Sequence, residues 1–344
     1  MSSTSAPATA SEQELLDAAR HGDEHAFRGL VEPHQGELQA HCYRMLGSLH
    51  DAEDALQDAL LRAWRGLPRM EGRGSLRSWL YRIATNACLD AIARRPKRVL
   101  PVDYGPPADA DDDSGRPLEA LWVEPYPDER LDNGYAAPEA RYEQREAVEL
   151  AFIAALQHLP GRQRAALILR DVLGFSAKEA AEALESTPAS VNSALQRARK
   201  TVDDRLPEQS QQATMRALGD ESLREIVRRF ADAFESGEVG AILDMLADDA
   251  AFTMPPYASW QQGREAIADS WLMPSGPNPR FLVRATSASG QPALGVYRLD
   301  PETETYLAIA LDVLTLDGAR IAEITAFRTP AIFARFGLPN ELVA

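Results

Sequence analysis

The stretch Gly174–Lys200, GFSAKEAAEALESTPASVNSALQRARK, is typical of two short helices joined by a tight turn. Ser176 and Glu179 have the S-x-x-E spacing of a capping box, which begins the first helix. Thr187 can cap the second helix, with Pro188 at the first helical position, where its missing N–H costs nothing. The pattern therefore predicts a helix-turn-helix.

The second helix of this pair has an apolar face and a polar face. Its apolar residues recur at helical spacing and predict one buried stripe, formed by Val191, Leu195, Ala198 and Val202. The remaining side chains point outward, and amide, hydroxyl and basic groups can read base edges or bind phosphates in DNA. A solvated amphipathic helix pair is the alternative interpretation. We expect the following residues to bind DNA: Ser190, Asn192, Ser193, Gln196, Arg197, Arg199 and Lys200.

Composition narrows the class of protein. The chain has 344 residues, of which 45% are hydrophobic and 26% charged, an ordinary globular composition with room for two or three domains. No apolar run approaches the ~20 residues that span a bilayer, and residues 1–14 lack the basic and apolar regions of a secretion signal. The two cysteines, Cys42 and Cys88, argue against a disulfide framework. We therefore expect a cytoplasmic protein without a membrane segment.

The net charge of −16 is unevenly distributed along the chain. Residues 62–98 contain ten basic and two acidic side chains, whereas residues 101–140 contain eleven acidic and two basic ones. Residues 207–344 are acidic again, with a net charge of −8. Because phosphate contacts depend on local charge, the overall acidity does not argue against binding to nucleic acid.

Composition also indicates the domain organisation. Residues 11–100 are helix-forming throughout, and residues 139–206 are helical and end in the helix-turn-helix. Between them, residues 101–138 are rich in Pro, Gly and Asp, which predicts an acidic linker rather than a buried loop. Residues 207–219 read as a second, polar linker, and residues 220–344 place helices before strands, the pattern of an α+β domain.

The strands of the last domain are predicted from apolar runs bounded by turn residues. Asp317-Gly318 is a strong hairpin signal between the last two of them. The expected helices span residues 221–235 and 264–271, and the expected strands span residues 281–286, 293–299, 306–316 and 320–328.

The first helical block contains an acidic motif at residues 48–64, SLHDAEDALQDALLRAW. Acids at its beginning and arginines at its end complement the helix dipole. Leu56, Leu60 and Trp64 are predicted to form its buried seam. The opposite face is either simply solvated or docks on a basic helical partner. Its residues are Asp51, Glu53, Asp54, Gln57 and Asp58.

A third motif occupies residues 72–95, GRGSLRSWLYRIATNACLDAIARR. Aromatic, arginine and amide groups together suit the unstacked bases of a single strand. Trp79 and Tyr81 are alternatively core residues, and for Trp79 the core is the preferred interpretation. The candidate nucleic-acid ligands in and around this motif are Met70, Arg73, Ser75, Arg77, Arg82, Asn86, Arg94 and Arg95.

With these three motifs in this order, the chain resembles an extracytoplasmic-function (ECF) sigma factor of the sigma-70 family, a promoter-specificity subunit of bacterial RNA polymerase. The resemblance covers residues 11–100 and 139–206. It implies that the D-A-E-D-x-x-Q-D run, residues 51–58, binds the clamp helices of the polymerase β′ subunit. It also implies contact with the β subunit and with promoter DNA.

The resemblance assigns the DNA elements as well. It implies that the third motif melts and reads the −10 element, with Asn86 capturing a flipped base, and that residues 159–200 read the −35 element. One departure is Glu185, which stands where the family often has Gly in the turn. Another is the linker, which is longer and more acidic than is usual in the family.

Residues 220–344 resemble the SnoaL-like branch of the cystatin-like α+β cone folds. Such domains can be enzymes that use an Asp base in an apolar pocket, and no histidine lies beyond His158. The carboxylates available for that role are Asp248, Asp249, Asp269 and Asp312. We expect ligand sensing or docking rather than catalysis, so no catalytic residue is assigned. Core positions are expected for Phe252, Tyr257 and Trp260.

No metal or cofactor is expected. His21 and His25 are one helical turn apart, and His41 neighbours Cys42, but the carboxylate or cysteine spacing of a metal site is missing, so we expect solvated histidines. A Walker loop and a G-x-S-x-G elbow are also absent.

The predicted fold is therefore multidomain, with two all-α sigma domains, the second carrying the helix-turn-helix, followed by an α+β SnoaL-like cone domain. The predicted function is promoter-specific transcription initiation, regulated in cis through intramolecular contact between the last domain and the sigma domains. Two other classes compete with this interpretation. An ordinary helix-turn-helix repressor has no need of the acidic motif, and a bifunctional protein with an active cyclase or isomerase domain is weakened by the missing histidines.

Overall fold

The computed structural model describes residues 11–70, 75–108, 122–131, 143–272 and 280–343. The chain forms two compact units. The first unit comprises Met1–Leu46, His50–Arg94 and Gly161–Leu195, and the second comprises Gly47–Leu49, Arg95–Pro160 and Gln196–Ala344. No helix within the described ranges is long and apolar enough to span a bilayer.

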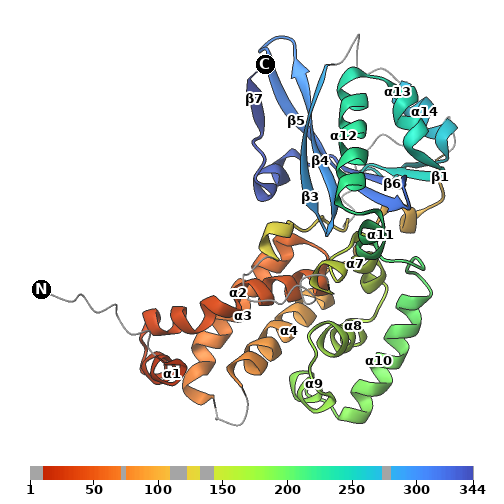
Figure 1. The fold of residues 1–344 in the computed structure, drawn as a ribbon. Coiled ribbons are helices and arrows are strands. Elements are labelled where there is room, and N and C mark those ends of the chain that lie inside the picture. Colours follow the sequence, from red (N-terminus) through yellow and green to blue (C-terminus); the bar gives the residue numbers. More distant parts are fainter. Residues whose placement is uncertain (1–10, 71–74, 109–121, 132–142, 273–279, 344) are drawn as a thin grey trace, which may run out of the picture. The chain divides into compact units, whose positions relative to one another are not determined.

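The first unit is helical (Figure 1). Helix α1 begins with the capping box of Ser11 and Glu14, and α2 and α4 pack against each other around buried side chains such as Leu38 and Leu80. The helices are α1 (Glu12–Arg20), α2 (Glu24–Leu46), α3 (Leu49–Gly66), η1 (Leu67–Arg69), α4 (Leu76–Arg94), α8 (Gly161–Leu167), the π-helical η3 (Ile168–Val172), α9 (Ala177–Ala183) and the beginning of α10 (Pro188–Asp203).

The buried seam of α3 differs from the predicted one. Leu56, Leu60 and Trp64 are only half-buried. The residues that lie fully in the core are small and follow the same helical spacing, namely Ala52, Ala55, Ala59 and Ala63. The prediction was based on the largest apolar side chains, whereas the small alanine side chains beside them are the ones buried in the core.

The helix-turn-helix forms as predicted. Ser176 and Glu179 make both bonds of the capping box, and the Thr187 hydroxyl accepts a hydrogen bond from the Ser190 amide at 3.2 Å. The stripe predicted on α10 is buried along its whole length. Glu185, which replaces the usual glycine of the turn, has a φ of 49°, so a left-handed conformation is retained at a non-glycine residue.

The second unit is built on a seven-stranded sheet of order β2-β1-β6-β5-β4-β3, with β7 paired to β5. All pairs are antiparallel except β1 with β6, and Gly318 with a φ of 52° forms the predicted hairpin between β5 and β6. The strands are β1 (Leu246–Thr253), β2 (Trp260–Gln262), β3 (Phe281–Ala288), β4 (Gln291–Asp300), β5 (Thr305–Asp317), β6 (Arg320–Phe327) and β7 (Glu341–Val343).

Three helices cover one face of this sheet, α12 (Asp220–Ser236), α13 (Val239–Met245) and α14 (Arg264–Leu272) (Figure 1). Phe230 of α12, Leu294 of β4 and Leu314 of β5 are completely buried in the core between the two layers. The predicted α+β character of the C-terminal region is thereby confirmed. The shorter helices of this unit are α5 (Pro101–Tyr104), η2 (Asp128–Arg130), α7 (Leu150–Gln157), α11 (Gln211–Leu218) and η4 (Pro330–Phe336).

Residues 122–131 are not the exposed linker that the sequence predicted. Trp122, Val123 and Tyr126 are buried, and Pro127 forms a β-bridge with Ala288 at the end of β3. The indole Nε1 of Trp122 donates to the Pro256 carbonyl at 3.0 Å. This part of the linker is therefore packed into the second unit. The second predicted linker also contains structure, because helix α11 begins within it.

The linker is held by the turn between β3 and β4. The Ser289 amide donates to the Tyr126 carbonyl at 2.7 Å, and the Tyr126 amide donates to the Ser289 hydroxyl at 3.0 Å. The Gly290 amide donates to Oδ1 of Asp128 at 2.8 Å. Gly290 has a φ of 69°, and a Cβ added there would lie 2.9 Å from the Arg145 carbonyl oxygen. The turn therefore requires glycine for both conformation and space.

The same turn also binds two helices. The Leu150 amide at the beginning of α7 donates to Oε1 of Gln291 at 3.1 Å, and Nε2 of Gln212 in α11 donates to the Gly290 carbonyl. Linker, α7 and α11 thus meet at three consecutive residues. We refer to the contacts of Ser289, Gly290 and Gln291 with these segments as the linker junction.

Candidate polymerase and nucleic-acid interfaces

The acidic face of α3 is exposed at three of its five predicted residues. Asp54, Gln57 and Asp58 are exposed and Glu53 is half-buried. Asp58 pairs with Arg62 at 2.7 Å, and Arg62 also pairs with Asp90 of α4 at 2.8 Å. The pairs leave a carboxylate-rich surface on the outside of the helix.

Asp51 does not belong to this exposed face. Its side chain is only 5% exposed, because it lies in the first turn of α3 beside the fully buried Ala52. The prediction that Asp51, Asp54 and Asp58 share one exposed face is therefore wrong for Asp51. The sequence pattern could not distinguish a buried acid in the first turn from an acid on the surface.

The candidate −10 residues lie along α4 and at its ends. Ser75, Arg82, Arg94 and Arg95 are exposed, and Met70 and Asn86 are half-buried. The position before α4 is fixed in part by Arg20, whose Nη2 donates to the Met70 carbonyl at 2.9 Å. Arg73 lies outside the described residues.

Of the two aromatic residues of this motif, Tyr81 lies deeper in the core than Trp79, for which the core was the preferred interpretation. Tyr81 is completely buried, whereas Trp79 is half-buried. The Tyr81 hydroxyl donates to Oε2 of Glu37 at 3.2 Å, and its ring packs edge-on against Phe175 at 5.3 Å between centroids. Burial, followed by the neighbouring Glu37 carboxylate, raises the pKa of Tyr81 well above its ordinary value, so the hydroxyl stays protonated and donating.

Arg77 is engaged by protein contacts. Its Nε lies 3.2 Å from Oε2 of Glu37, and its guanidinium lies 5.0 Å from the ring centroids of both Tyr81 and Phe175. Phe175 immediately precedes the helix-turn-helix helices. In this conformation Arg77 therefore joins α4 to the helix-turn-helix region by an ion pair and two cation–π contacts.

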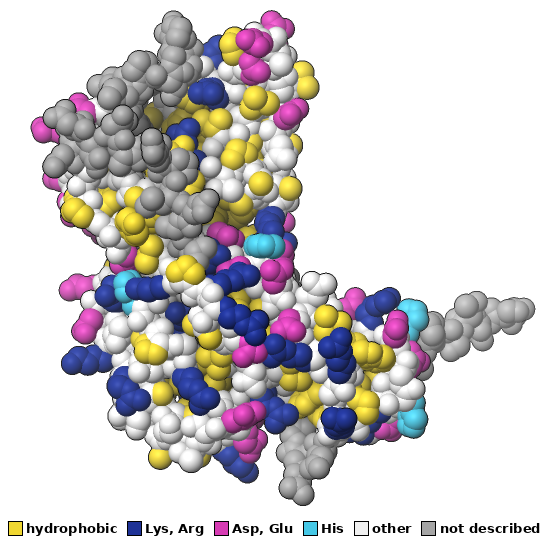
Figure 2. Space-filling view, turned by 180° about the vertical axis from the view of Figure 1, so that it is seen from behind, with side chains coloured by type: hydrophobic (Ala, Val, Ile, Leu, Met, Phe, Trp, Pro, Cys, Tyr) yellow, Lys and Arg dark blue, Asp and Glu magenta, His cyan; other side chains and the backbone are white. Residues whose placement is uncertain are grey.

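All seven candidate −35 residues are exposed on α10: Ser190, Asn192, Ser193, Gln196, Arg197, Arg199 and Lys200. The buried stripe on the opposite side of the helix fixes their orientation, as the spacing predicted. Figure 2 shows that Lys and Arg side chains are spread over the helical part of the molecule on the face drawn. The exposed set contains two amides and three cations, which are the groups that read bases and bind phosphates.

The histidines do not assemble a metal site. Among the residues that the structure describes, no cluster of three or more His, Cys, Asp or Glu side chains could hold an ion. His21 and His25 are exposed as expected, but His41 is buried, and its Nε2 lies 2.9 Å from the Thr85 hydroxyl. Burial, reinforced by Arg44, lowers the pKa of His41 to about 3, so the ring is neutral. The expectation of a solvated histidine is therefore wrong for His41.

The four candidate carboxylates of the C-terminal domain have different surroundings. Asp248, Asp249 and Asp269 are exposed, and Asp248 pairs with Arg264 at 2.9 Å. Asp312 of β5 is only 3% exposed, and its Oδ1 has no hydrogen-bond partner among the described residues. Burial raises the pKa of Asp312 to about 7, with a smaller opposing effect from Arg328. Of the aromatic residues, Phe252 and Trp260 are buried as predicted, whereas Tyr257 is half-buried.

One important carboxylate was missed by the sequence analysis. Glu149 precedes α7 and accepts hydrogen bonds from the amides of Gln211 and Gln212, at 3.1 and 2.9 Å, so it caps the first turn of α11. Burial raises the pKa of Glu149 to about 7 although both amide bonds oppose the shift. No short-range sequence pattern indicates this cap, because Glu149 and Gln211 are 62 residues apart in the sequence.

Comparison with known families divides the chain into three parts. Residues 30–98 match Sigma-70 region 2, residues 143–202 match Sigma-70 region 4, and residues 227–324 match the SnoaL-like domain. The helix-turn-helix therefore lies within the region 4 match, and the sheet of the second unit lies largely within the SnoaL-like match.

Individual relatives agree with this division. The chain is 39% identical over 327 residues to the ECF RNA polymerase sigma factor SigG of Mycobacterium tuberculosis, which covers 94% of this chain and 86% of that protein. It is 28% identical over 195 residues to the RNA polymerase sigma-H factor of Pseudomonas aeruginosa, covering 57% of this chain. The crystal structure of the extracytoplasmic function sigma factor SigJ of M. tuberculosis has the same fold, with a TM-score of 0.52, 20% identity and coverage of 89% of this chain and 96% of that one.

The buried Asp312 predicts an unusual dependence of stability on pH. Its folded-state pKa of about 7 lies above the ordinary value of 3.8, so the folded chain holds this proton more tightly than the unfolded chain. The resulting stability is fully present below pH 3.8 and is lost as the pH rises through 7. We expect Asp312→Asn to raise the free energy of unfolding at pH 8 by about 1–4 kcal/mol, and to raise it by a smaller amount at pH 5, where only part of this stability has been lost.

The measurement is urea denaturation of the full chain at both pH values. Asp249→Asn, an exposed change on β1, is the matched control and is expected to alter neither value. Equal effects of Asp312→Asn at pH 5 and pH 8 would contradict the protonation argument.

Proposed function

Because the chain belongs to the extracytoplasmic-function sigma factors of RNA polymerase, we propose that it directs core polymerase to a subset of promoters in the cytoplasm and that its SnoaL-like domain regulates this activity in cis. The observation that carries the proposal is the combination of two separate exposed surfaces. One is the carboxylate face of α3, and the other is the amide and cation face of α10. A DNA-binding repressor needs only the second surface.

The acidic face of α3 is the proposed polymerase contact. Asp54, Gln57 and Asp58 are exposed on one side of a helix whose opposite side is fixed in the core by small residues. A face with two carboxylates and an amide held on one helix suits a basic helical surface, and we assign it to the clamp helices of the β′ subunit. Glu53, half-buried beside it, supports this face from its edge.

The two DNA elements are assigned to α4 and α10. The exposed face of α10 suits the major groove of a duplex −35 element, with Arg197 as a candidate for bidentate contact with guanine. Asn86 on α4 is half-buried and carries an amide that can hydrogen-bond an unstacked base edge of the −10 element. Arg77 becomes available for DNA only when its contacts with Glu37 and Phe175 are broken.

The C-terminal domain acts on the linker in this proposal. Trp122, Tyr126 and Asp128 are bound by residues of the sheet domain, so the domain restricts the segment that joins the two DNA-reading regions. A sigma factor whose linker is restrained has fewer relative positions available to those regions. We assign a regulatory binding role to this domain, rather than a catalytic one, because its contacts are with the chain itself.

The polymerase contact predicts the effect of charge reversal. We expect Asp54→Lys with Asp58→Lys to weaken association with core polymerase at least tenfold, because two attractive contacts become repulsive. The measurement is native pull-down with purified core polymerase, followed by run-off transcription. Glu12→Lys with Glu24→Lys, also two exposed acids in the first unit, is the control and should bind normally. Undiminished binding by the α3 variant would remove this face from the interface.

The −35 contact predicts a sequence-dependent loss. Arg197→Ala should weaken binding by about 1–3 kcal/mol on promoters that carry the contacted guanine, and by less on promoters in which that base is replaced. Lys200→Ala, which removes a phosphate-type cation from the same helix, should weaken binding to a similar extent on every sequence. Footprinting across base substitutions measures both. A uniform loss for Arg197→Ala would place that side chain on phosphate instead.

The linker junction predicts a regulatory phenotype. Gly290→Ala places a Cβ 2.9 Å from the Arg145 carbonyl oxygen at a φ of 69°, so it should loosen the junction and increase run-off transcription by the full chain. Gly318→Ala is the matched control, because it has a φ of 52° but nothing within 4 Å of the added Cβ. Both substitutions strain the backbone, and only the first displaces the junction. Equal transcription by the two variants would contradict regulation through the linker.

A further inference from the structure

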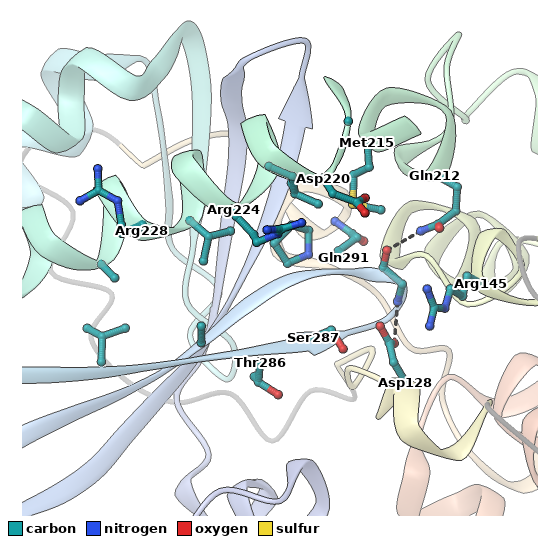
Figure 3. A pocket seen from close by; sticks show the side chains of 18 of the residues that line it. Asp128, Arg145, Gln212, Met215, Asp220, Arg224, Arg228, Thr286, Ser287 and Gln291 are labelled. Carbon is teal, nitrogen blue, oxygen red and sulfur yellow. Dashed lines mark hydrogen bonds between the residues drawn. The ribbon is translucent and has the colours of Figure 1, made fainter. Parts of the chain in front are cut away.

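A cavity of about 770 Å³ lies in the second unit between α11, α12, strand β3 and the linker junction. Its volume falls in the range of pockets that bind small organic molecules. Figure 3 shows its charged and polar side chains, with Asp128 and Arg145 close together and Arg224 extending from α12 toward Gln291. The wall of the cavity is thus shared by the C-terminal domain and the linker.

One side of the cavity is apolar. Leu223, Val227 and Ala231 follow each other at four-residue spacing on α12 and are half-buried against the domain core. This stripe extends over about 12 Å of helix. Met215 of α11 and Val283 of β3 extend the apolar lining. A ligand here therefore needs an elongated apolar body rather than a compact polar one.

Most of the charged side chains around the cavity are paired, and the two without an ion pair among the described residues are Arg224 and Asp220. Arg228 binds Glu225 and Asp232, each at 2.7 Å, and the Asp128 carboxylate accepts from the Gly290 amide. Arg224, one turn before Arg228, lines the cavity without an ion pair to any residue in the described ranges. Asp220, at the first position of α12, is stabilised there by the helix dipole. Arg224 is thus a cation available to a ligand.

The edge of β3 offers further donors. The Val283 amide points away from β4 and donates to Oε1 of Glu235 at 2.7 Å. Because backbone groups alternate along an antiparallel strand, the amides of Ala285 and Ser287 point to the same outer edge, and both residues line the cavity. These outward backbone groups suit an anionic or carbonyl oxygen.

We propose that this cavity binds an amphipathic monocarboxylate, with its apolar chain along Leu223, Val227 and Ala231 and its carboxylate on Arg224. A single unpaired cation matches a single negative charge, and the apolar stripe excludes small inorganic anions as the main ligand. Since Asp128 and Gly290 form part of the wall, occupancy is coupled to docking of the linker. The coupling between ligand and linker rests on the regulatory role proposed above and extends it. Binding of the ligand does not depend on that role.

The test uses the full chain and decanoate as the probe, with binding measured by isothermal titration calorimetry. We expect decanoate to bind, and Arg224→Gln to weaken the affinity about 10- to 100-fold, as expected for loss of a charge-assisted hydrogen bond. Arg229→Gln is the matched control, because Arg229 is an exposed arginine of the same helix that does not line the cavity. Decanol and acetate, which supply the chain or the carboxylate alone, should each bind at least tenfold more weakly.

Hydrogen exchange supplies a second measurement on the same samples. Decanoate should slow amide exchange in residues 122–131, of which Asp128 contributes to the wall. It should do so in Arg229→Gln but not in Arg224→Gln at the same concentration. Absence of binding, or equal affinity of the Arg224→Gln and Arg229→Gln proteins, would overturn the site. Binding without a change in exchange would overturn its coupling to the linker. Run-off transcription without decanoate tests the sigma function separately. A failure of the proposed sigma function can therefore be distinguished from a failure of the binding site or of its coupling to the linker.

Discussion

The hydrogen bonds of a three-residue turn, Ser289–Gln291, determine how the second unit is assembled. Backbone and side-chain groups of this turn bind the linker at Tyr126 and Asp128, the beginning of α7 and Gln212 of α11. Leaving one such buried group unpaired costs about 1–3 kcal/mol, so each of these contacts stabilises the junction. Residue 290 can be only glycine without displacing the Arg145 backbone. The position of the linker and the contact of Gln212 with the sheet depend on this arrangement, and the turn forms part of the cavity wall.

Features encoded by neighbouring residues were predictable from the sequence. The capping boxes at Ser11 and Ser176, the Thr187 cap, the buried stripe of α10 and the hairpin at Asp317-Gly318 form as expected. In each case the deciding interaction spans four residues or fewer, or a regular helical spacing. The exposure of the seven candidate residues on α10 follows from the same spacing, because a buried stripe fixes the opposite face.

Features that depend on distant partners were not predictable. The composition of residues 101–138 is that of a solvated linker, and only the sheet domain explains why Trp122 and Tyr126 are buried. The same applies to Glu149, whose role is to cap a helix distant in sequence. Asp51 illustrates the limit within one helix, since acids in the first turn and acids on the exposed face have the same sequence signature. Amphipathic spacing predicted a buried seam of Leu56, Leu60 and Trp64 on α3, although the fully buried residues are alanines.

The sequence separation of the junction contacts has a consequence for synthesis of the protein on the ribosome. Tyr126 and Ser289 are 163 residues apart, and Leu150 and Gln291 are 141 residues apart. At translation rates of about 5–20 residues per second, the linker emerges roughly 8–30 s before the turn that binds it. Both sigma regions are therefore complete while the linker of the nascent chain is still undocked. Docking of the linker onto the C-terminal domain is possible only at the end of translation, so a ribosome that stalls before residue 291 yields a chain with an undocked linker.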